Sequence, residues 1–77
     1  MSLFEGVKGN HYEIRELCVE EAITRRLQAL GLNDGTVVTI LNRKKSGALI
    51  IRVRGTRLAL GRHICQGIKV EERADEG

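Results

Sequence analysis

The strongest constraint on the fold is a change of hydrophobic period around residue 31. Before it, apolar residues recur at helical spacing and predict an amphipathic helix over residues 19–30 with one buried stripe: Val19, Ile23, Leu27 and Leu30. After Gly35 the apolar residues alternate with polar ones, which is typical of a half-buried strand. The chain therefore joins its only long helix directly to a sheet.

The sequence also predicts how this helix ends. Gly31 stands where a left-handed residue stops a helix, and Leu32 follows in position to touch Leu27, as in a Schellman motif. The start is less well defined, because no Ser, Thr, Asp or Asn stands before the helix as an N-cap. We therefore expect a fixed C-terminus and a less strictly fixed N-terminus.

Short alternating segments surround the helix and predict a mainly β protein with one main helix. The expected strands cover residues 11–17, 36–42, 48–54, 57–60 and 67–71, with a single helical turn over 62–65. Strands this short, spaced this closely, suggest a small barrel of about five strands. Pairing of the last strand with an earlier one would remove exposed sheet edges.

A two-residue turn at Gly55 and Thr56 is predicted between the third and fourth strands, because glycine suits the first position of a type II′ turn. In that register Arg54 lies opposite Arg57, on the face away from the core. Opposed like charges are unfavourable unless a partner offsets them. Together with Arg52, these residues are candidates for contact with an acidic protein surface, and the alternative is a solvated outer face of the sheet.

Charge is distributed unevenly along the single expected domain, residues 1–77. Residues 22–70 hold ten basic residues against Asp34 alone, whereas the two ends are net acidic. This basic central segment favours an anionic partner, such as a protein, a nucleic acid or a lipid headgroup. Alternatively, it forms a solvated surface that the acidic ends partly neutralise. We expect residues 72–77 to be an acidic, frayed tail. One Phe and one Tyr argue against a platform for base stacking.

Several classes of protein are disfavoured by the sequence. Ser2 and Ser46 lack an accompanying His and acid, and no glycine-rich phosphate loop follows a strand, so we expect no enzyme activity. Neither a signal peptide nor a span of roughly 20 apolar residues is present, which predicts a soluble chain. Two cysteines are too few for a disulfide scaffold, although a single Cys18–Cys65 bond stays open.

Taken in order, these segments resemble the ferrous iron transport protein A (FeoA) family. The similarity rests on RLxxLGLxxGxxVxIL over residues 26–41, VxG over 53–55, LAL over 58–60 and RxxCxxIxV over 62–70. Cys65 stands where the family usually has a small residue, and the loop over residues 43–47 is shorter than is common. The resemblance extends over roughly residues 12–71.

This resemblance implies an SH3-like barrel that acts as a non-catalytic accessory protein of ferrous iron uptake in the bacterial cytoplasm. The implied partner is the cytoplasmic GTPase portion of the membrane permease, ferrous iron transport protein B (FeoB). The protein would lie at the inner face of the membrane through this partner, without inserting. Related domains form the C-terminus of iron-dependent repressors, whereas we expect this domain to be free-standing. Whether it activates or inhibits the permease stays open.

The candidate partner surface combines the basic residues of the outer hairpins with one outward aliphatic residue: Arg52, Arg54, Arg57, Lys44, Lys45 and Ile50. No CxxC or zinc-type spacing occurs, so no cofactor is expected. His63, Cys65 and His11 are the only candidates for a weak transition-metal site, and His63 and Cys65 would point apart on a helical turn. A small basic nucleic-acid-binding barrel and a transition-metal sensor or chaperone remain alternatives.

Overall fold

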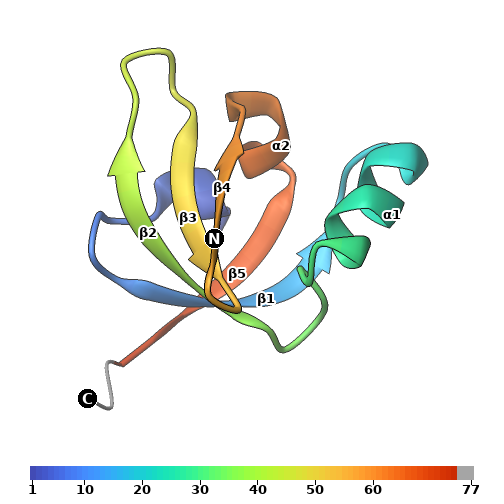
Figure 1. Ribbon diagram of the computed structural model, residues 1–77, viewed down its shortest axis with the longest axis horizontal. Coiled ribbons are helices and arrows are strands. Elements are labelled where there is room, and N and C mark those ends of the chain that lie inside the picture. Colours follow the sequence, from blue (N-terminus) through green and yellow to red (C-terminus); the bar gives the residue numbers. More distant parts are fainter. Residues whose placement is uncertain (75–77) are drawn as a thin grey trace.

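Five antiparallel strands and one main helix make up the protein, as the sequence predicts. The computed structural model describes residues 1–74. Along the chain the elements are η1 (Leu3–Glu5), β1 (His11–Leu17), α1 (Glu21–Ala29), β2 (Val37–Arg43), β3 (Leu49–Val53), β4 (Thr56–Leu60), α2 (Arg62–Gln66) and β5 (Ile68–Arg73). The strands form one sheet in the order β4-β3-β2-β1-β5, so the last strand pairs with the first (Figure 1).

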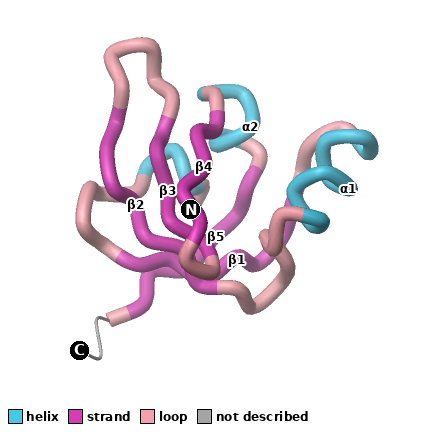
Figure 2. Tube along the Cα trace, in the orientation of Figure 1, coloured by secondary structure: helices cyan, strands magenta, loops and turns pink. Residues whose placement is uncertain are grey.

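The sheet is strongly bent, and its curvature creates the interior of the barrel (Figure 2). The pairing of β1 with β5 is interrupted between Ile14 and Glu16, and the pairing of β2 with β3 is interrupted between Ile40 and Asn42. Such bulges bend a strand and increase its twist. The enclosed core is almost entirely aliphatic: Leu3, Tyr12, Ile14, Leu27, Leu32, Val38, Ile40, Leu49, Ile51, Val53, Leu60, Cys65, Ile68 and Val70.

The helix end has the predicted geometry. Gly31 adopts φ +102°, the Leu32 amide donates to the Leu27 carbonyl at 2.9 Å, and the Gly31 amide donates to the Gln28 carbonyl at 3.0 Å. These two bonds define a Schellman motif. At the other end, α1 begins two residues later than predicted, and the side chain of Glu20 makes no capping hydrogen bond.

The predicted buried stripe of the helix is only partly buried. Leu27 is 3% exposed, Val19 and Ile23 are half-buried, and Leu30 is 45% exposed. Figure 1 shows the reason, because α1 stands to one side of the sheet, beyond the end of β1, instead of lying across it. The prediction that Leu30 belongs to the core is therefore wrong.

An N-terminal strap, residues 1–7, was not anticipated from the sequence. Leu3 is fully buried, and the Val70 amide of β5 donates to the Met1 carbonyl at 2.9 Å. The buried Tyr12 hydroxyl accepts the Val7 amide at 2.7 Å. A local signal was present, because Ser2-x-x-Glu5 is a capping-box pattern and the Glu5 carboxylate accepts the Ser2 amide at 2.8 Å.

The turn between β3 and β4 differs from the prediction. Its central residues are Arg54 and Gly55, with φ +50° and +79°, which is the positive-φ pair of a type I′ turn. Arg52 consequently lies opposite Arg57, and the predicted pairing of Arg54 with Arg57 is wrong. The register moves by two residues, so the predicted apolar and polar faces are preserved, because side chains alternate with a period of two.

The last strand is longer than predicted. Glu72 and Arg73 pair with Tyr12 and His11 on β1, where the sequence suggested the beginning of a frayed tail. The remainder of that predicted tail, residues 75–77, lies outside the described residues. Within residues 1–74, no helix has the length and apolar character needed to cross a bilayer.

Candidate functional site

Two arginines stand side by side on the outer face of the sheet. Arg52 of β3 and Arg57 of β4 are direct cross-strand neighbours, and both are exposed. Side chains so placed have Cβ atoms roughly 5 Å apart. Neither arginine forms an ion pair with any residue between 1 and 74. Their mutual repulsion is therefore not offset within the described part of the molecule.

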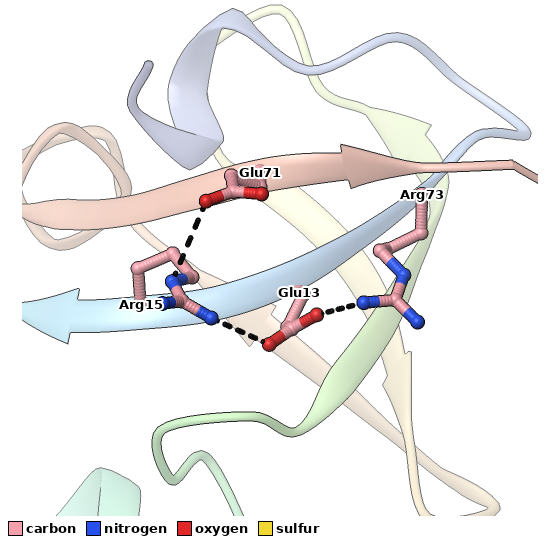
Figure 3. Close-up of polar contacts among 4 residues, drawn as sticks. All are labelled: Glu13, Arg15, Glu71 and Arg73. Atoms are coloured by element: carbon pink, nitrogen blue, oxygen red, sulfur yellow. Dashed lines mark hydrogen bonds and ion pairs between the residues drawn. The ribbon is translucent and has the colours of Figure 1, made fainter.

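Acidic residues of the same sheet are paired elsewhere, on β1 and β5 (Figure 3). The Glu13 carboxylate accepts a hydrogen bond from Arg15 at 2.7 Å and binds Arg73 through its other oxygen. Arg15 also reaches Glu71 of β5 at 3.6 Å. These carboxylates neutralise arginines of their own two strands, so they leave the pair on β3 and β4 without acids.

The arginine pair continues into a polar row that crosses all five strands. Direct cross-strand partners follow one another from β4 to β5 in the order Arg57, Arg52, Thr39, His11 and Arg73. In the middle of the row, His11 Nδ1 lies 2.7 Å from Thr39 Oγ1. The row thus carries positive charge at both ends, and the candidate metal ligand His11 is engaged within it.

Arg54 occupies a different position from the arginine pair. It lies in the β3–β4 turn, and its side chain covers Gly31 so closely that a Cβ at that glycine would come 2.9 Å from Arg54 Cδ. The guanidinium group therefore sits at the C-terminal end of α1, where the helix dipole favours a cation. The turn is held against the helix end by this contact.

The structure places the two predicted lysines apart from the arginine pair. Lys44 and Lys45 lie at the tip of the β2–β3 loop, whereas Arg52 lies near the opposite end of β3 (Figure 1). Ile50 is on the outer face, between Asn42 and Ala59, and is half-buried instead of exposed. The predicted set of partner-binding residues is thus divided between two ends of one ribbon.

At the loop end, an aromatic ring lies between two cations. The guanidinium carbons of Arg43 and Arg62 are 4.9 and 5.3 Å from the centre of the Phe4 ring, within the range of cation–π attraction. Arg43 also donates to the carbonyls of Phe4 and Gly6, at 2.6 and 2.9 Å. These contacts fasten the N-terminal strap to β2 and α2.

The remaining candidate metal ligands do not converge. Cys65 is fully buried, and its thiol donates to the Leu60 carbonyl at 3.5 Å. His63 is exposed, with Nε2 at 3.2 Å from a carboxylate oxygen of Glu20. Throughout residues 1–74, no group of three or more His, Cys, Asp or Glu is arranged to hold a metal ion.

Cys65 is expected to resist alkylation in the native protein, whereas the exposed Cys18 reacts. Burial raises the pKa of the Cys65 thiol from 9.0 to about 11. Its reactive thiolate fraction at pH 8 is then about 100-fold below that of an ordinary cysteine. Mass spectrometry after iodoacetamide treatment should show one adduct, with a second appearing only in denaturant. Rapid double labelling without denaturant would contradict the buried position.

Comparison with known proteins decides the family. The model of the FeoA domain matches residues 1–72. The chain belongs to the FeoA family. The solution structure of FeoA from Chlorobium tepidum is 33% identical, with a TM-score of 0.91 over all of this chain and 75% of that one. No curated protein matches the chain.

Two further solved structures have a similar fold. The zinc complex of Stenotrophomonas maltophilia FeoA, described as a prokaryotic SH3 domain protein, is 28% identical with a TM-score of 0.76, over 92% of this chain and 89% of that one. ScaR with bound Cd²⁺ shares the fold at 24% identity and a TM-score of 0.81, over 92% of this chain and 35% of that one. The predicted SH3-like barrel is confirmed, and this FeoA-family protein is a small protein associated with ferrous iron transport.

Among residues 1–74, sequence reasoning missed three exposed aliphatic residues, of which Val7 lies in the N-terminal strap and is 57% exposed. Leu30 and Val37 are each 45% exposed. For Val37 the signal was available, because Val38 and Ile40 point inward and alternation places residue 37 outward. For Leu30 no local signal existed, since its spacing matches that of the buried Leu27.

Proposed function

We propose that this protein is a non-catalytic accessory protein that binds and regulates the cytoplasmic GTPase portion of the ferrous iron permease FeoB. Membership of the FeoA family supports the process. One observation supports the mode of action: the exposed Arg52 and Arg57 stand directly opposed, with no acid paired to either within residues 1–74. An acidic partner surface would relieve this repulsion on binding.

The proposed contact depends on electrostatic complementarity. Each guanidinium group offers a planar fork of donors that matches a carboxylate, so two neighbouring arginines suit a surface with adjacent Asp or Glu side chains. Exposed charges of this kind chiefly raise the association rate, and their effect falls as salt screens them. Because the proposed partner is the cytoplasmic portion of a membrane permease, the protein would act at the inner face of the membrane without inserting.

Reversing the arginine pair is the test. Arg52→Glu with Arg57→Glu is expected to weaken binding to the isolated GTPase domain at least tenfold, because two attractive contacts become repulsive. Affinity would be measured by calorimetry at about 0.15 M salt. Both side chains are exposed, so the fold should be retained, and circular dichroism would verify it.

The matched control is Lys44→Glu with Lys45→Glu, which changes the net charge by the same amount at the other end of the ribbon. We expect its affinity to stay within about threefold of the wild type, because distant exposed charges are screened. Equal losses in both double variants would reject the arginine face in favour of overall charge. Failure of the wild-type protein to bind the domain would reject the proposed function.

A further inference from the structure

The end of α1 and the β3–β4 turn form a corner with unusual surface composition. Leu30, the C-cap residue of α1, and Val37, the first residue of β2, are each 45% exposed there. Arg54 links the two. Its side chain covers Gly31, which is next to Leu30. Arg52, two residues before Arg54, pairs with Thr39, which is two residues after Val37, so the antiparallel register brings Arg54 toward Val37.

Arginines outnumber acids around this corner in the described structure, because Glu13, the cross-strand partner of Val37, is already paired with Arg15 and Arg73. Arg26 lies one helical turn before Leu30, is exposed, and like Arg54 makes no ion pair with residues 1–74. Asp34, in the loop between α1 and β2, acts electrostatically on Arg15 of β1. The corner therefore consists of two aliphatic side chains bordered by arginines, and the Arg52–Arg57 pair lies next along the sheet.

This composition is typical of a protein-binding surface. Interfaces place apolar side chains at their centre and polar ones at the rim, and arginine is enriched in them. The position of Leu30 also needs a reason, because a leucine on the apolar stripe of a helix is normally covered by the same protein. Leu27, one turn earlier on the same helix, is buried, whereas nothing within residues 1–74 covers Leu30 enough to bury it.

We propose that Leu30 and Val37 are the apolar centre of the docking surface, and that the occupant is an acidic segment of the permease's cytoplasmic portion carrying exposed aliphatic side chains. This inference rests on the proposed function, and it names the residues that supply the salt-independent part of the binding affinity. Charge complementarity identifies the occupant, since the rim is formed by Arg26 and Arg54. A second copy in a two-fold arrangement would set this positive rim against itself.

The test removes apolar surface without changing charge. Leu30→Ser with Val37→Thr is expected to weaken binding to the GTPase domain at least tenfold at both low and about 0.5 M salt. The salt dependence of the remaining affinity should be unchanged, because the arginines are intact. The control is Val7→Thr, which alters a side chain 57% exposed in the N-terminal strap and should leave the affinity unchanged.

The outcomes separate this inference from the proposed function. If the apolar double variant binds like the wild type while the charge reversal weakens binding, the apolar centre is rejected and the proposed function stands. If the wild-type protein does not bind the domain, both are rejected. If sedimentation shows a wild-type dimer that the double variant abolishes, the occupant is a second copy and the inference is overturned.

Discussion

Replacing Leu27 with alanine is expected to lower the free energy of unfolding by about 3 kcal/mol. Leu27 is 3% exposed and is the only fully enclosed side chain of α1. Its truncation removes buried methyl groups and leaves a cavity that the aliphatic neighbours fill only partly. A domain of this size has a total stability of only about 4–11 kcal/mol, so the loss is a large fraction of the whole.

Leu30→Ala is the matched control, one turn along the same helix. Because Leu30 is 45% exposed, we expect its truncation to cost less than about 0.5 kcal/mol. Urea unfolding followed by circular dichroism would measure both variants against the wild type. Similar losses for the two leucines would contradict the exposure of Leu30 at the end of the helix.

Replacing Gly67 with alanine is expected to cost about 3 kcal/mol through crowding. A Cβ at Gly67 would come 2.6 Å from the Cys18 carbonyl oxygen and 2.5 Å from Val19 Cγ1. The Gly67 carbonyl also accepts the Cys18 amide at 2.6 Å, so the two segments cannot separate without weakening that bond. The added methyl group therefore clashes with a backbone atom and pushes the segment before α1 away from the end of α2.

Gly61, at the other end of α2, provides the control. Its φ of −68° suits any residue, and a Cβ there meets no atom within 4 Å. Gly61→Ala should change the free energy of unfolding by no more than about 0.5 kcal/mol, because a compatible backbone angle removes the usual penalty. In thermal melts, Gly67→Ala should lower Tm by at least about 12 °C and Gly61→Ala by no more than about 4 °C. Equal melting temperatures would refute the close approach at Gly67.

The arginine pair and the apolar corner describe one continuous surface with two physical components. The arginines would govern how fast an acidic partner associates, and the aliphatic centre would govern how long it stays. Both lie at the same end of the β3–β4 ribbon, and the lysine loop lies at the other end (Figure 1). Comparing the charge reversal with the apolar double variant separates the two components in a single assay.

Local physics determined much of this fold from the sequence. The end of α1 follows from Gly31, because only a residue that tolerates positive φ completes the Schellman bonds. Strand faces follow from alternation, and even a register shift of two residues leaves Ile51 and Leu58 pointing inward. The ordered motifs were sufficient to indicate the FeoA family.

Only the tertiary structure decided the register of the β3–β4 hairpin, the exposure of Leu30 and the separation of the lysines from the arginines. Alternation has a period of two, so it cannot distinguish turns that differ by an even shift, and the pairing of Arg52 with Arg57 had to be observed. Helical spacing shows which side chains share a face. Whether that face is covered depends on what packs against it, and at the end of α1 nothing within residues 1–74 covers Leu30 enough to bury it.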